Sequence, residues 1–207
     1  MSDLLDPPAA APDAEPDASG VGQRSSRTAA FVSLAVAVVM IGLLVLLVGA
    51  NPNDESADSP LLGNPAPEAL ATDLRSGDDF DLSRRKGSWV VINFFQSDCR
   101  PCITEHPELI EFVEQQRGLP IGGAEFYSVA VGDTREGALG FFDERGGDWP
   151  VLYSENDQFS QSFGVAAVPE TWIIDPDGFV LGRFISEVTA DTLSVSLQQL
   201  REQAAMR

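Results

Sequence analysis

Apolar residues follow two kinds of pattern along this chain of 207 residues. Residues 28–50 (TAAFVSLAVAVVMIGLLVLLVGA) contain no charged side chain, and about 20 apolar residues are enough to cross a bilayer as a helix. From residue 61 onward, short apolar runs alternate with segments of helical periodicity. The pattern predicts a transmembrane helix at 28–50, a polar linker at 51–60 and one folded domain at 61–207.

The segments that flank the apolar stretch predict its orientation. Residues 1–27 are rich in Ala, Pro and Asp, which predicts a disordered tail. Arg24 and Arg27 precede the stretch and acidic residues follow it, and basic flanks stay in the cytoplasm. We therefore expect a cytoplasmic N-terminus and a domain on the outer side of the cell membrane. The small residues at 48–50 leave cleavage of this signal anchor as an alternative.

Within residues 61–207, strands and helices are expected to alternate. The apolar run 89–95 (WVVINFF) predicts a strand buried on both faces, and the stretch 99–116 predicts a helix. Asp133 and Glu136 have the spacing of a capping box at the start of another helix. Further strands are expected at 70–72, 80–82, 124–131, 151–153, 171–174 and 180–185, and further helices at 133–145, 157–163 and 190–203. This order predicts an α/β fold in which parallel βαβ units meet an antiparallel hairpin.

The composition narrows the possible functions. Asp and Glu number 32 against 13 Lys and Arg, the net charge is -19, and Lys86 is the only lysine. Binding of phosphate groups needs clustered basic residues, so this balance argues against nucleic acid as a partner. The acidic residues are spread along the whole chain, which is typical of a solvated surface. Two cysteines are too few for several disulfides or for a four-cysteine zinc site.

The two cysteines, Cys99 and Cys102, stand where the predicted buried strand passes into a helix. Unpaired N–H groups at a helix start favour a thiolate, which is the species that attacks disulfides. Pro101 suits the first helical turn, and the charge of Arg100 favours the thiolate further. We predict that Cys99 attacks a disulfide and that Cys102 resolves the mixed disulfide. A static disulfide or half of a metal site are the alternatives.

Two stretches, NFFQSDCRPCITEHPEL (93–109) and GVAAVPETWIIDPDGFVLGRF (164–184), resemble the TlpA-like thiol-disulfide oxidoreductases. This group is membrane-anchored and thioredoxin-like, of the ResA/CcmG type, and the segment from Leu61 resembles its domain start. The resemblance implies a thioredoxin-like fold with a central mixed sheet flanked by helices, an N-terminal hairpin and a central insertion. It implies no cofactor and no metal, because the Cys99–Cys102 pair is itself the redox-active group.

The resemblance also assigns roles to individual residues. Pro169 matches a cis-proline that faces the disulfide, so Val168, Pro169 and Glu170 are implied to bind substrate. Glu105 matches an acidic residue that tunes thiol acidity and relays protons. Asn93 occupies the place where ordinary thioredoxins bury an aspartate, and an asparagine there is frequent in the TlpA-like group.

Asp98 departs from the family, which usually has a tryptophan before the first cysteine. An aspartate at this position could cap the helix. Its charge could also oppose a thiolate at Cys99, against the pull of Arg100 and of the helix start. Asp98 is therefore grouped with Arg100, Pro101 and Asn93 as a residue that tunes the redox potential, with the net direction left open.

The resemblance implies that the protein reduces disulfides of apocytochrome c, with electrons from a membrane thiol donor of the CcdA/DsbD type. The alternatives are a disulfide oxidase or isomerase for secreted proteins, a peroxiredoxin-like peroxidase, and a metal-binding domain without enzymatic activity. His106 is the only histidine. With the thiols and Glu105 it could bind a soft metal, but such a site normally recruits a second, distant histidine, which the chain lacks. We therefore expect His106 to be a helix-surface residue near the cysteines.

Overall fold

The computed structural model describes residues 26–49, 59–119 and 122–206. They fall into two units, one that ends at Asn51 and a domain from Pro52 onward. Most of the predicted tail (1–27) and of the predicted linker (51–60) lies outside the described residues, which include only 26–27 and 59–60 of these segments. The first helix begins at Ser26, within the predicted tail.

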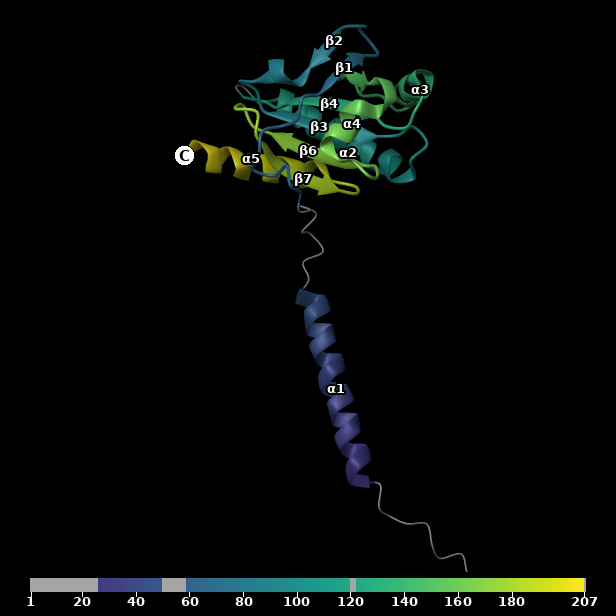
Figure 1. Cartoon of the computed structure of the whole chain (residues 1–207), viewed down its shortest axis with the longest axis vertical. Helices are drawn as coiled ribbons and strands as arrows, with labels where there is room; N and C mark the ends of the chain where they lie inside the picture. Colours follow the sequence, from purple (N-terminus) through teal and green to yellow (C-terminus); the bar gives the residue numbers. More distant parts are fainter. Residues whose placement is uncertain (1–25, 50–58, 120–121, 207) are drawn as a thin grey trace, which may run out of the picture. The chain divides into compact units, whose positions relative to one another are not determined.

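The N-terminal unit contains helix α1 (Ser26–Gly49), close to the predicted boundaries 28–50 (Figure 1). The side chains described for this helix, residues 31–42, are all exposed. Within the described parts of the chain, no helix is both long enough and apolar enough to cross a membrane. The transmembrane segment therefore stays a prediction.

The described part of the domain is built on one seven-stranded mixed sheet (Figure 1). Its strands follow the spatial order β2-β1-β5-β4-β3-β6-β7. Strands β3, β4 and β5 are parallel to one another, and the remaining pairs are antiparallel. The strands are β1 (Leu70–Asp73), β2 (Asp79–Asp81), β3 (Val90–Phe95), β4 (Glu125–Ala130), β5 (Val151–Tyr153), β6 (Glu170–Ile174) and β7 (Val180–Ile185). The predicted mixed sheet and its N-terminal hairpin are confirmed.

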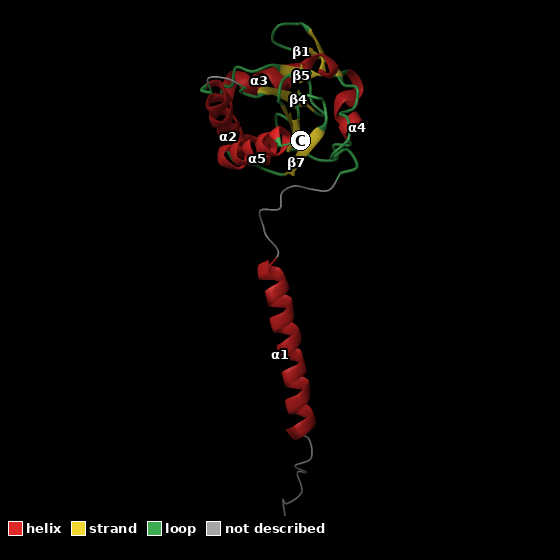
Figure 2. Cartoon of the chain, turned by 90° about the vertical axis from the view of Figure 1, so that its left-hand side faces the viewer, coloured by secondary structure: helices red, strands yellow, loops and turns green. Residues whose placement is uncertain are grey.

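Helices cover both faces of the sheet (Figure 2). One face carries α2 (Arg100–Arg117), α3 (Arg135–Arg145) and α5 (Ala190–Ala205), and the other carries α4 (Gln158–Phe163). Short 3-10 helices, η1 (Leu82–Arg85) and η2 (Glu155–Asp157), precede β3 and α4. Because both faces are covered, all six residues of β3 are buried, as its continuous apolar run predicted.

The predicted capping box at Asp133 and Glu136 is wrong. The N-cap of α3 is Thr134, whose hydroxyl accepts the N–H of Gly137 at 2.9 Å. The carboxylate of Asp133 instead accepts hydrogen bonds from Ser97, in the loop that follows β3. A contact between residues so far apart in the sequence outweighs the local capping pattern.

The expectation of a surface position for His106 is also wrong, since only 3% of this residue is exposed. Its ring packs edge-on against Phe141 and Phe142 of α3 and lies near Trp149. Its Nε2 atom lies 3.0 Å from the carbonyl oxygen of Gly146. Burial lowers the pKa of His106 below its usual value, because the charged ring would lose its hydration.

We expect the free energy of unfolding to fall as the pH drops below about 6.5. The unfolded chain binds a proton on His106 there while the folded chain does not, which costs about 1 kcal/mol per pH unit. Urea unfolding in mildly alkaline and mildly acidic buffer measures this slope. Because His106 is the only histidine, His106→Gln should flatten it. The same slope in both proteins would contradict the prediction.

Candidate active site

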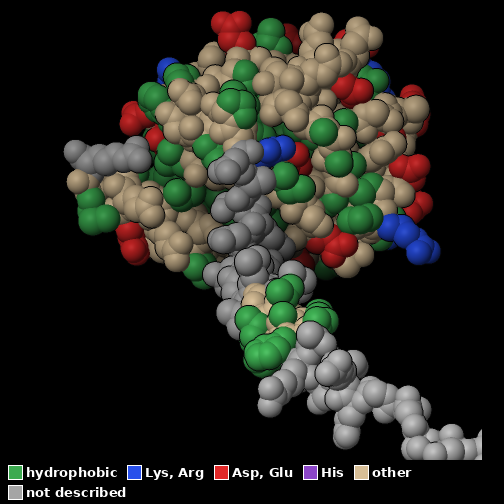
Figure 3. Space-filling model, turned by 60° about the horizontal axis from the view of Figure 1, so that its bottom comes forward, with side chains coloured by type: hydrophobic (Ala, Val, Ile, Leu, Met, Phe, Trp, Pro, Cys, Tyr) green, Lys and Arg blue, Asp and Glu red, His purple; other side chains and the backbone are tan. Residues whose placement is uncertain are grey.

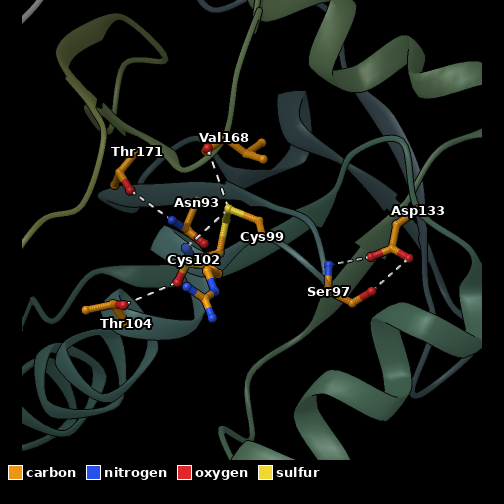
Figure 4. The surroundings of a disulfide bond; sticks show 9 residues. Asn93, Ser97, Cys99, Cys102, Thr104, Asp133, Val168 and Thr171 are labelled. Carbon is orange, nitrogen blue, oxygen red and sulfur yellow. Dashed lines mark hydrogen bonds between the residues drawn. A yellow bond between two sulfur atoms is a disulfide. The ribbon is translucent and has the colours of Figure 1, made fainter.

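The two cysteines lie where β3 passes into α2, and they form a disulfide with their Cα atoms 5.3 Å apart. Cys99 is the N-cap of α2, and its sulfur accepts the N–H of Cys102 at 3.2 Å (Figure 4). Pro101 occupies the first turn, where a missing N–H costs nothing. The sulfur of Cys99 thus lies at the end of the helix that stabilises a negative charge.

The two cysteine residues differ in their exposure to solvent. Cys99 is half-buried, whereas only 3% of Cys102 is exposed. A protein disulfide can therefore reach Cys99 more easily than Cys102. This difference agrees with the predicted roles of Cys99 as the attacking and Cys102 as the resolving cysteine, which stay predictions.

The loop before β6 lies directly over the disulfide. The carbonyl oxygen of Val168 is 3.6 Å from the sulfur of Cys99 (Figure 4). The Val168–Pro169 peptide bond is cis, as the resemblance implied. Pro169 is buried, and its own carbonyl accepts the N–H of Ser186, which has a left-handed φ of 78°. The Val168 carbonyl is thus the backbone group of this loop that faces the reactive sulfur.

Glu170 follows this loop but does not line its surface. Only 2% of the Glu170 side chain is exposed, and its two oxygens accept hydrogen bonds from Arg183 at 2.9 and 3.2 Å. The ion pair joins β6 to β7. The structure therefore places Glu170 in a buried ion pair, and its contact with substrate stays a prediction. Sequence reasoning missed Arg183.

Two polar residues are buried near the pair. Asn93 of β3 donates a hydrogen bond from Nδ2 to Oγ1 of Thr171 in β6 at 3.1 Å (Figure 4). Glu105 lies on α2, about one turn beyond Cys102, and is 2% exposed. A carboxyl group held inside the domain at this place agrees with the predicted relay of protons, and that role stays a prediction.

Asp98 and Arg100, on either side of Cys99, are both exposed. Asp98 does not cap α2, because Cys99 itself occupies the N-cap position. That expectation is therefore corrected.

Acidic side chains are scattered over the face of the domain that Figure 3 shows, in agreement with the predicted solvated surface. In the described residues, no group of three or more His, Cys, Asp or Glu lies close enough to hold a metal ion.

Sequence reasoning also missed the contact between Ser97 and Asp133. The backbone N–H of Ser97 donates to Oδ2 of Asp133 at 2.6 Å, and its hydroxyl lies 3.1 Å from Oδ1 (Figure 4). Strands β3 and β4 are parallel neighbours, so the loops that follow them meet at one edge of the sheet. A polar residue shortly after each of two predicted parallel strands is the signal that would have indicated this contact.

Comparisons with known proteins agree with this geometry. Residues 62–182 match the AhpC/TSA family. The chain is 32% identical to the thiol:disulfide interchange protein HelX of Rhodobacter capsulatus, over 81% of this chain and 97% of that protein. It is 28% identical to the thiol-disulfide oxidoreductase ResA of Bacillus subtilis, over 69% of this chain and 81% of that protein.

Two solved structures share the fold. The thioredoxin domain of a thiol-disulfide oxidoreductase from Bacteroides vulgatus has a TM-score of 0.59 at 21% identity, covering 69% of this chain and 99% of that one. A DsbF homologue from Corynebacterium diphtheriae also has a TM-score of 0.59, at 22% identity, covering 72% and 96%. At these identities the likeness concerns the fold.

The ion pair between Glu170 and Arg183 can be tested by its effect on stability. We expect Glu170→Gln to lower the free energy of unfolding by about 2 kcal/mol, because it replaces a buried carboxylate that accepts two hydrogen bonds from a guanidinium group with a neutral amide. Glu155→Gln is the matched control, since Glu155 pairs with Arg135 at 2.7 Å while 73% of its side chain is exposed. The control should change stability by less than about 1 kcal/mol. Equal effects in urea unfolding would contradict the assignment.

Proposed function

This chain belongs to the AhpC/TSA family and is a thiol-disulfide oxidoreductase of the HelX and ResA type. From this premise we propose that it reduces disulfides of apocytochrome c outside the cytoplasmic membrane. The observation that carries the proposal is the Cys99–Cys102 pair at the start of α2, under the Val168 carbonyl. The choice of apocytochrome c rests on the resemblance of residues 93–109 and 164–184 to the TlpA-like group.

The proposed reaction begins with both cysteines reduced. The thiolate of Cys99 attacks one sulfur of the substrate disulfide, forms a mixed disulfide and releases the other substrate sulfur as a thiolate. The thiolate of Cys102 then attacks the sulfur of Cys99, which breaks the mixed disulfide and releases the second substrate thiol. Two electrons pass to the substrate, and the protein is left with the Cys99–Cys102 disulfide that the structure contains.

A further turnover needs a dithiol that reduces this disulfide. We propose a membrane donor of the CcdA/DsbD type, which delivers two electrons by the same exchange at Cys99. The half-buried position of Cys99 supports this, because the same sulfur must meet both the substrate and the donor. Val168 supplies a backbone carbonyl at the place where either partner would lie.

The proposed location rests on α1. This helix covers an uncharged stretch, and the side chains described for it are all exposed, so an apolar surface surrounds this part of the helix. A bilayer would cover such a surface. Arg24 and Arg27 before the stretch support a cytoplasmic N-terminus, with the domain on the outer side.

The substrate can be identified by trapping. In cells that produce the full chain with Cys102→Ser, Cys99 should hold its partner as a mixed disulfide because no second thiol resolves it. We expect non-reducing gels and mass spectrometry to identify apocytochrome c in this adduct. Cys99→Ser is the control and should trap nothing. A stable adduct that contains only other secreted proteins would contradict the proposed substrate.

Arg100 favours a second candidate, an oxidase of secreted proteins. This exposed cation next to Cys99 stabilises the thiolate and hence the reduced form. The reduction potential separates the two directions: about -270 mV is typical of thioredoxin and about -120 mV of the oxidant DsbA. We expect equilibration of the full chain with glutathione to give a value nearer to thioredoxin. A value near DsbA would support the oxidase.

A further inference from the structure

We propose that Asp133 is a positioning residue for thiol-disulfide exchange, because its carboxylate clamps the loop that carries Cys99. Asp133 lies in the loop between β4 and α3, far from the cysteines in the sequence. The inference rests on exchange at Cys99 and is independent of which protein is the substrate.

Three donors converge on the two oxygens of this carboxylate. The N–H of Ser97 donates to Oδ2 at 2.6 Å. The hydroxyl of Ser97 and the N–H of Thr134 donate to Oδ1 at 3.1 and 2.7 Å. An ionised carboxylate only accepts hydrogen bonds, so it satisfies all three donors at once. An asparagine has one acceptor oxygen, and its NH2 group would face one of the backbone N–H groups. The site therefore requires aspartate.

Further contacts hold the two loops together. Nε2 of Gln96 donates to the carbonyl of Gly132 at 3.2 Å, and the N–H of Val131 donates to the carbonyl of Phe95 at 2.9 Å. The loop of Asp133 is itself held from the far side, where Oδ1 of Asp157 accepts the N–H of Gly132 at 3.0 Å. The loop of Asp133 is thus tied both to the segment that precedes Cys99 and to Asp157, in the segment that leads into α4.

The clamp acts on Cys99 through a very short segment. Ser97 precedes Cys99 by two residues, and the N–H of Cys99 donates to the carbonyl of Gln96 at 3.2 Å. The position of Ser97 therefore determines the position of the Cys99 sulfur relative to the N–H of Cys102, which lies 3.2 Å from it. If the loop is released, the sulfur spends less time at the helix start, and the thiolate loses part of its stabilisation.

Gly137 offers a way to disturb the clamp without removing its charge. A Cβ atom at Gly137 would lie 2.6 Å from Oδ1 of Asp133 and 3.1 Å from the hydroxyl of Ser97. It would also lie 3.0 Å from the hydroxyl of Thr134, the N-cap of α3. Gly140 lies on the same helix, and a Cβ atom there has no neighbour within 4 Å. Both Gly→Ala changes raise helix propensity. Gly140→Ala is therefore the matched control for Gly137→Ala.

Asp133→Asn separates the clamp from the charge. If Asp133 acted only as a negative charge near Cys99, its removal would favour the thiolate and speed the reaction at neutral pH. Release of the loop has the opposite effect, because the sulfur leaves the helix start. The direction of the change therefore distinguishes the two roles.

The test measures alkylation of Cys99 by iodoacetamide against pH. It uses the full chain in a Cys102→Ser background, where Cys99 is the only thiol. We expect Gly137→Ala to move the midpoint of the profile to higher pH. At neutral pH, Cys99 should react more slowly in both Gly137→Ala and Asp133→Asn, by about threefold for each unit by which the pKa of its thiol rises. Each unit lowers the thiolate fraction about tenfold, and the higher intrinsic nucleophilicity of the remaining thiolate offsets part of this loss. Gly140→Ala should match the parent protein.

An unchanged midpoint in Gly137→Ala, or faster alkylation of Asp133→Asn, would overturn the proposal. If Gly137→Ala does not fold, as thermal unfolding would show, the direction of the change in Asp133→Asn decides alone. Alkylation by iodoacetamide requires neither a substrate disulfide nor a partner protein, so this test is independent of the proposed substrate. A failure to trap apocytochrome c therefore contradicts only the proposed function, and a failure here contradicts only the clamp.

Discussion

Strand β3 is buried over its whole length, and it pairs with β4 on one side and β6 on the other. Its side chains alternate between two separate cores, with Val91 and Phe95 on the face of α2 and Val90, Ile92 and Phe94 on the face of α4. A strand held in this way cannot slide by one residue, since every side chain would change faces. The point at which the chain leaves the sheet, and with it the place of Cys99, follows from this constraint.

The directions of the neighbouring strands bring the other parts of the site to the same edge. Strand β4 is parallel to β3, so the loop of Asp133 lies beside the loop of Ser97. Strand β6 is antiparallel and begins at this edge, with Glu170 opposite Phe94, which brings Val168 over the disulfide. Three segments that are far apart in the sequence thus meet because of strand direction, and only one of them contains a cysteine.

Local patterns were sufficient to predict most of the fold and the centre of the site. The apolar run of β3, the periodicity of α2 and the position of Cys99 between them are properties of neighbouring residues, and the structure agrees with each. Apart from the helix cap expected at Asp98, the errors concern contacts between distant segments. The burial of His106 depends on α3 covering that side of α2, and the pairing of Glu170 depends on Arg183 from the next strand. Neither partner can be assigned from one sequence, because periodicity does not tell which helix covers which face.

The carbonyl of Val168, a backbone group from outside α2, lies 3.6 Å from the reactive sulfur. A partner that donates a backbone N–H to this carbonyl would be recognised there through its main chain, whatever its side chains. Selectivity among protein partners would then depend on exposed side chains around the Cys99–Cys102 pair, such as those of Asp98 and Arg100. Replacing those exposed side chains would accordingly change which partners bind without altering the disulfide or the carbonyl that faces it.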